Sequence, residues 1–185
     1  MSDVLNYTNH SRNHSYMSGI ERDKLRIKQT AEIFTPTELV QRMLDDFEKQ
    51  YPVAFSDSSK TFIDNSCGDG QILSEVIIRK MERSNCTLEQ ALSTIYGVEL
   101  MEDNVKLCKE RLAGLSPTMK ILKILDKNIV CADALTYDYS FGEPVGIEWL
   151  LGGWRALKQV VTVMVVENFF SKINGWFSND TYIYI

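Results

Sequence analysis

The sequence is poor in the residues that build metal sites and disulfide frameworks. It has two histidines, His10 and His14, both near the N-terminus, and four cysteines without a Cys-x-x-Cys pair. A zinc site needs further ligands that this spacing does not supply, so we expect no bound metal and reduced thiols. No apolar run is long enough to cross a bilayer and no signal-peptide pattern is present, which predicts a cytoplasmic protein without membrane contact.

Acidic residues outnumber basic ones, 25 Asp and Glu against 20 Lys and Arg, which gives a formal net charge of -5. A protein that wraps duplex DNA unaided is usually basic, so a dominant nucleic-acid surface is disfavoured and a local one stays open. The 185 residues, of which 44% are hydrophobic, fit one soluble domain with a real core. We expect residues 1–18, rich in Ser, Asn and His, to be a flexible arm or one ordered only by contact, and residues 19–185 to form a single domain.

The most informative stretch is Thr61–Gln71, which reads TFIDNSCGDGQ. A short apolar run ends at Asp64, Gly68 and Gly70 follow, and an amphipathic segment begins at Gln71. A strand, a glycine turn and a helix in this order let a nucleoside-bearing ligand lie against backbone N–H groups and a helix N-terminus. A tight strand-to-helix turn without any ligand is the alternative interpretation.

Strands and helices alternate along the middle of the chain. Thr61–Asp64, Ile95–Leu100 and Asn128–Ala132 have strand character, and amphipathic helical segments separate them. This alternation predicts an α/β fold whose sheet is mostly parallel and carries helices on both faces.

Two helix starts carry capping signals. Thr35 is placed to cap a helix, with Pro36 at its first position and Glu38 closing a capping box. Thr87 and Gln90 have the same box spacing ahead of a short helix.

An acidic residue closes each of the three predicted strands: Asp64, Glu99 and Asp133. Ligands of parallel sheets bind beyond the carboxyl ends of the strands, so each acid has a plausible task. Glu99 can accept hydrogen bonds from ribose hydroxyls, Asp133 from the exocyclic amine of a purine, and Asp64 with the glycine turn can meet a polar tail. One Gly-x-Gly and no Walker lysine disfavour pyrophosphate ligands, and S-adenosylmethionine fits better.

Four segments, in this order, resemble the motifs of adenine-specific DNA methyltransferases whose donor-binding half comes first. They are Phe34-Thr35-Pro36, Asp64–Gly70, Gly97–Glu99 and Cys131–Ala134. The resemblance implies a Rossmann-like methyltransferase sheet, S-adenosylmethionine as cofactor, and adenine in DNA as acceptor, as in restriction–modification systems. Asn65 stands where the family commonly has proline. The resemblance assigns to the donor Phe34, Thr35, Pro36, Asp64, Ser66, Cys67, Gly68, Gly70, Glu99, Leu100, Asp133 and Ala134.

The family's catalytic motif, Asn or Asp followed by Pro-Pro and an aromatic residue, has no clear counterpart. The last proline is Pro144, and the sequence contains no Pro-Pro pair. The strand-like segment Val160–Val166 leads to Asn168 and Phe170, a faint echo of the residues that hold and stack a flipped base. A strand end with core aromatics is the alternative interpretation of Asn168 and Phe170.

Residues 145–185 differ in character from the rest. All three tryptophans follow Pro144, and Thr181–Ile185 is an uncharged, β-prone run that invites pairing with a second copy or a partner subunit. The sheet is therefore expected to be divergent or incomplete there. The sequence predicts an S-adenosylmethionine-dependent adenine methyltransferase acting on DNA, or its donor-binding portion. The alternatives are a catalytically inactive S-adenosylmethionine-binding or partner-binding protein, and methyl transfer to RNA, protein or a small molecule.

Overall fold

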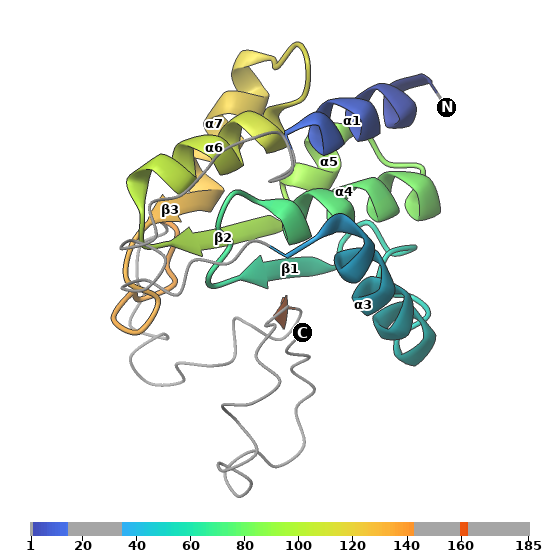
Figure 1. Ribbon diagram of the computed structural model, residues 1–185, viewed down its shortest axis with the longest axis horizontal. Coiled ribbons are helices and arrows are strands. Elements are labelled where there is room, and N and C mark those ends of the chain that lie inside the picture. Colours follow the sequence, from blue (N-terminus) through green and yellow to red (C-terminus); the bar gives the residue numbers. More distant parts are fainter. Residues whose placement is uncertain (1, 15–34, 143–159, 163–185) are drawn as a thin grey trace, which may run out of the picture.

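The computed structural model describes residues 2–14, 35–142 and 160–162 (Figure 1). Its strands are β1 (Thr61–Asp64), β2 (Ile95–Glu99), β3 (Ile129–Cys131) and β4 (Val160–Thr162). They form one open sheet in the order β3-β2-β1-β4, and every neighbouring pair is parallel. The prediction of an α/β chain with a parallel sheet is confirmed.

The helices described lie on one face of this sheet. They are α1 (Ser2–Asn13), α3 (Thr37–Gln50), α4 (Gln71–Ser84), α5 (Leu88–Leu92), α6 (Glu102–Ala113) and α7 (Met119–Asn128). The chain steps in one direction from β1 to β2 to β3, and right-handed crossovers then place α4 and α6 on the same side (Figure 1). The expected helices on both faces are thus seen on one face only within the described residues.

Alternation along the strands divides the core in two. Phe62 and Ile95 point into the large cluster shared with the helices, whereas Ile63 and Val98 point to the opposite face. On that second face the loop after β3 supplies the partners, of which Phe141 is buried. The loop after β3 thus covers the face of the sheet opposite the described helices.

Residues 2–13, within the segment expected to be a flexible arm or one ordered only by contact, form helix α1. Tyr7 and Ser11 are four residues apart on α1 and both are buried. Arg12 of α1 donates both Nε and Nη2 to the carboxylate of Glu75 in α4, at 2.9 and 3.0 Å. The sequence pattern missed this helix because polar contacts, rather than a wide apolar stripe, hold it in place.

Helix α3 begins differently from the expectation. Pro36 occupies the N-cap position, no side chain caps the helix, and the carbonyl of Pro36 accepts from the N–H groups of Leu39 and Val40. The box predicted for Thr35 and Glu38 is therefore wrong: with ψ of 144°, Pro36 is still extended, and the helical bonds start at its carbonyl.

The second predicted box is confirmed. The Thr87 side chain accepts from the Gln90 N–H, and the Gln90 side chain accepts in return from the Thr87 N–H, at 3.2 and 2.9 Å. None of the described helices combines the length and the apolar character needed to span a membrane.

Candidate functional site

The glycine turn after β1 is as tight as the sequence indicates. Gly68 and Gly70 have φ of 52° and 81°, a left-handed region that glycine adopts without a steric cost. The Gly70 N–H donates to the Cys67 carbonyl at 2.8 Å, and Gly70 is the N-cap of α4. A Cβ on Gly70 would lie 2.8 Å from the Cys108 sulfur, so α6 packs directly against the turn.

Glu99 fastens this turn to the end of β2. Its Oε2 accepts from the Gly68 N–H at 2.9 Å and its Oε1 from the Met101 N–H at 3.0 Å. The residue is 9% exposed. Because a carboxylate oxygen can accept about two hydrogen bonds, Oε2 keeps capacity for a hydroxyl donor.

Asp64 lies at the end of the neighbouring strand β1 and is 4% exposed. Burial raises the pKa of Asp64 to about 7, the hydrogen bond from the Ser66 N–H opposes that change, and the charge of Glu99 adds to it. The Asp64 carboxyl therefore changes its charge near neutral pH, and a cation placed beside it would favour its ionised form.

Asp133 completes the row of acids beyond β3. It is exposed, and its Oδ1 accepts from the Leu135 N–H at 2.9 Å. The Ala132 N–H donates to the Glu99 carbonyl at 2.9 Å, which keeps this turn beside β2. Leu100 and Leu135 expose 59% and 94% of their surface here, so apolar area is available next to the carboxylates.

The remaining predicted site residues divide into three groups. Thr35 and Pro36 precede α3, whose Thr37 hydroxyl accepts from the Gln71 side-chain amide at 2.9 Å, so the Thr-Pro turn is joined to the start of α4. Ser66 is exposed and Ala134 half-buried in the turns after β1 and β3. The predictions for Phe34, Asn168 and Phe170 lie outside the described residues.

Cys67 has a packing role. It is buried, and a Cβ on Gly97 would lie 2.8 Å from its sulfur. A hydrogen bond with Cys108 and burial both raise the pKa of the Cys67 thiol, which keeps it protonated and unreactive. All four cysteines are free thiols, as predicted. Within the described part of the chain, no cluster of three or more His, Cys, Asp or Glu side chains is arranged to hold a metal ion.

Sequence reasoning missed a buried ionic group behind the glycine turn. Arg111 of α6 is 1% exposed and its guanidinium pairs with the carboxylate of Asp69, the residue between the two glycines. Arg111 also donates to the Gln71 side-chain oxygen and to the His14 carbonyl. The available signals were an acid inside the glycine turn and an arginine on the same face of α6 as Cys108.

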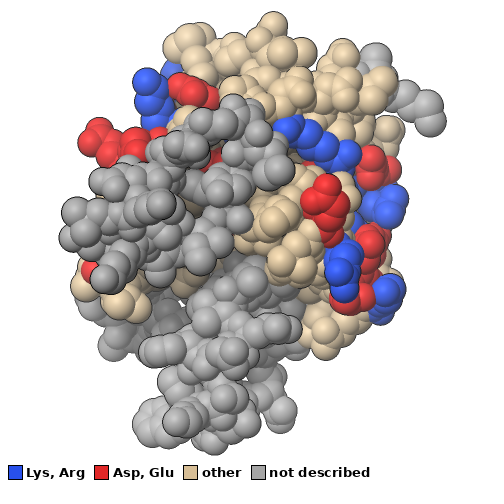
Figure 2. All heavy atoms as spheres, viewed as in Figure 1, with Lys and Arg blue, Asp and Glu red and all other residues tan. Residues whose placement is uncertain are grey.

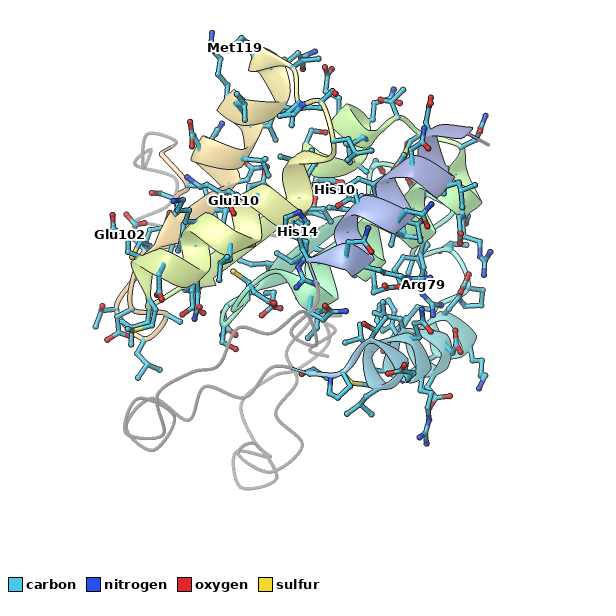
Figure 3. All side chains as sticks on the ribbon, turned by 45° about the horizontal axis from the view of Figure 1, so that its top comes forward. His10, His14, Arg79, Glu102, Glu110 and Met119 are labelled. Carbon is cyan, nitrogen blue, oxygen red and sulfur yellow. The ribbon has the colours of Figure 1, made fainter. Side chains whose placement is uncertain are left out.

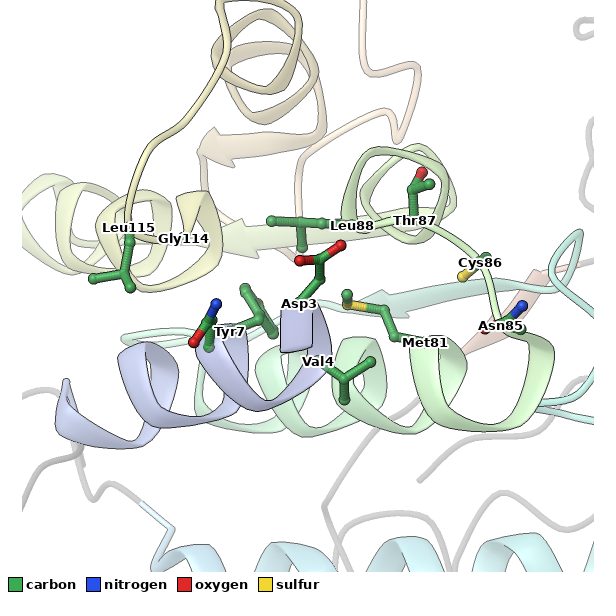
Figure 4. A pocket seen from close by; sticks show the side chains of 11 residues that line it. Asp3, Val4, Tyr7, Met81, Asn85, Cys86, Thr87, Leu88, Gly114 and Leu115 are labelled. Carbon is green, nitrogen blue, oxygen red and sulfur yellow. The ribbon is translucent and has the colours of Figure 1, made fainter. Parts of the chain in front are cut away.

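A separate pocket of about 360 Å³ lies at the other end of the helix layer (Figure 4). Its walls come from α1, the end of α4, the start of α5 and the segment after α6. Helix α4 runs from the carboxyl end of β1 to the amino end of β2, so its last turn lies away from the acids. This pocket does not belong to the row of carboxylates.

Charges on the visible surface alternate in sign. Figure 2 shows basic and acidic side chains next to one another on the described residues. The described residues form ion pairs between α3 and α4, such as Arg83 with Glu48 at 2.8 Å and Arg79 with Asp45 at 2.6 Å. Pairwise neutralisation of this kind lowers the attraction of a surface for nucleic-acid phosphates.

Comparison of the chain with protein-family models, with curated proteins and with solved structures found no match. The function must therefore be inferred from the geometry of the chain's own residues.

Proposed function

We propose that the chain binds S-adenosylmethionine at the carboxyl ends of β1, β2 and β3. It would act as a methyltransferase on the amino group of adenine in DNA, or supply the donor-binding portion of such an enzyme. The observation that carries the proposal is the Glu99 carboxylate, which accepts from the Gly68 N–H inside the glycine turn while Asp64 lies within its electrostatic reach.

The strand order supports this location. In the order β3-β2-β1-β4 the chain reverses direction beside β1, and ligands of doubly wound sheets bind at such a switch point. The order is compatible with a Rossmann-like methyltransferase sheet. Asp64 and the glycine turn lie at the end of the strand next to the reversal, where the polar tail of a ligand would enter.

The chemistry of the three acids matches the parts of the donor. Asp64 is buried, and a cationic ammonium or sulfonium nearby would stabilise its ionised form. Glu99 would accept from the ribose hydroxyls, and Asp133 from the adenine amine. The exposed side chains of Leu100 and Leu135 would cover the faces of the adenine ring. The donor, when bound, supplies the methyl group.

The acceptor is proposed from the sequence. Acceptor groups that pull on the hydrogens of the adenine amine make it nucleophilic, and Asn168 with the stacking ring of Phe170 remain the proposed residues for this task. DNA is the proposed partner.

The second candidate function is the binding of S-adenosylmethionine, or of a partner, without catalysis. The absence of any Pro-Pro pair from the 185 residues favours it, because the family motif uses that pair next to the target base. Its donor site would be the same.

Calorimetric titration with S-adenosylmethionine, with its demethylated product and with ATP tests the donor site. We expect both adenosyl-amino-acid ligands to bind and ATP to bind much more weakly, and Glu99→Gln to abolish donor binding. Glu89→Gln is the matched control, because Glu89 forms a surface ion pair with Lys120 away from the turn. No binding by the unaltered protein would overturn the proposal.

Transfer of a labelled methyl group to DNA then separates the two functions. Incorporation into DNA that depends on Glu99 supports the methyltransferase. Donor binding without transfer to DNA or RNA selects the binding protein.

A further inference from the structure

Arg111 joins three separate segments of the chain. Its guanidinium pairs with Asp69 in the glycine turn, donates to the side chain of Gln71 at the start of α4, and donates to the carbonyl of His14 at the end of α1. The three partners are separated from Arg111 by 40 to 97 residues in the sequence. One buried cation therefore connects the proposed donor turn with the N-terminal helix.

Helix α1 is attached mainly by polar groups on the side that faces α4 and α6. Arg12 reaches Glu75, which is 2% exposed, through two hydrogen bonds. Nε2 of His10 lies 3.1 Å from the Glu110 carbonyl, and Figure 3 shows His10 and His14 on the side of α1 next to Glu110.

Two features weaken the packing of α1 against the rest of the described chain. Tyr7 is the one buried apolar side chain that the structure describes in α1. Three buried polar atoms, Tyr7 Oη, Ser11 Oγ and Arg111 Nε, have no hydrogen-bond partner within residues 2–14, 35–142 and 160–162. A buried polar group without a partner destabilises the packing around it. Helix α1, in which one apolar side chain is described as buried, should therefore detach more readily than the helices that pack on the sheet.

We propose that Arg111 is a positioning residue that makes the conformation of the glycine turn depend on the docking of α1. When α1 leaves, Arg111 loses the His14 carbonyl and gains access to water, so its hold on Asp69 weakens. Asp69 is buried between two glycines in left-handed conformations, and the turn loses its support with that ion pair. Because coupling is reciprocal, a ligand that needs the ordered turn holds α1 in place.

The coupling should affect the binding of one part of the ligand, its amino-acid tail. This step of the inference rests on the proposed function. The glycine turn would hold the amino-acid tail of the donor, whereas Glu99 and Asp133 would hold the adenosyl part. Changing Arg111 should therefore weaken the binding of S-adenosylmethionine more than the binding of adenosine, which lacks the tail. General loss of structure would weaken the binding of both ligands equally.

The first experiment needs no ligand. Hydrogen exchange is measured on the full chain with Arg111→Lys, which keeps the charge but loses the planar fork that reaches several acceptors. We expect faster exchange in residues 2–13 and in residues 66–71 together. Arg83→Lys, in a surface ion pair with Glu48, is the control and should change neither segment. Faster exchange in the turn with α1 unchanged, or the reverse, overturns the coupling.

A second variant guards against a general effect of altering a buried arginine. Arg12→Gln combined with Glu75→Gln removes the ion pair between α1 and α4, keeps the pair of Arg111 with Asp69, and leaves no buried charge unpaired. It should raise exchange in residues 66–71 as well, and an unchanged turn contradicts the proposal.

The third measurement is the ratio of the dissociation constants for S-adenosylmethionine and adenosine. We expect the ratio to rise about tenfold in Arg111→Lys, which corresponds to about 1.4 kcal/mol. An unchanged ratio overturns the role of Arg111 in holding the tail. If the unaltered protein binds neither ligand, the proposed function fails, while hydrogen exchange still decides whether α1 and the turn are coupled.

Discussion

Replacing Asp64 by asparagine should change the way in which stability depends on pH. The carboxyl is 4% exposed, and its pKa is raised to about 7 from the ordinary value of 3.8. A raised pKa means that the folded protein favours the protonated form. The stabilisation is complete below the unfolded pKa, near 4, and is lost as the pH rises through 7.

The size of the effect follows from the two pKa values. Between about pH 5 and pH 8 the folded protein should lose about 2–3 kcal/mol of unfolding free energy through this one group. Asparagine has nearly the same shape and cannot ionise. The unaltered protein should therefore lose stability relative to Asp64→Asn as the solution becomes more alkaline.

Urea unfolding of both proteins across this pH range measures the difference. Asp126→Asn is the control, because Asp126 is exposed and pairs with Lys109 on the surface. Parallel stability curves for the unaltered protein and Asp64→Asn would show that Asp64 ionises without hindrance in the fold. That result would contradict the burial of the Asp64 carboxyl and its proposed role beside a cationic group of the ligand.

Further substitutions test the other parts of the site and its support. Glu99→Gln removes the charge that accepts from two backbone N–H groups, and we expect a loss of about 1–3 kcal/mol in urea unfolding as well as loss of donor binding. Gly97→Ala places a methyl group 2.8 Å from the Cys67 sulfur and should cost about 1–3 kcal/mol, part of which Cys67→Ala should restore in the double variant. Thr87→Ala breaks the capping box with Gln90 and should cost about 1 kcal/mol; no change in the midpoint would mean that water replaces the cap.

Local chemistry explains the features that could be predicted from the sequence. Strand β1 has the predicted bounds, Thr61–Asp64, because the acid and the glycines directly after it leave no other place for the strand to end. The capping box of Thr87 needs only residues three apart. The acids at the ends of β1 and β2 lie close enough for their charges to interact, because parallel strands align their carboxyl ends, and the sequence pattern already indicated such strands.

Contacts between distant segments explain what the sequence did not show. The pair formed by Asp69 and Arg111 joins residues 42 apart in the sequence. Aspartate and arginine are residue types that are mostly exposed, so the sequence gives no sign that these two are buried. Helix α1 depends on a similar distant partner, Glu75, for its main attachment. The start of α3 differs because a proline can serve either as the N-cap or as the first helical residue, and the sequence pattern alone does not distinguish the two.

The measurement that tests the central claim most directly is a titration of the isotopically labelled protein with S-adenosylmethionine, followed by the NMR shifts of backbone amides. A ligand held by the acids at the ends of the strands should shift the amides of Gly68, Gly70, Leu100 and Ala134 together and saturably. Shifts confined to the pocket around Leu115, or no shifts at all, would contradict an adenosyl site at the carboxyl ends of the strands.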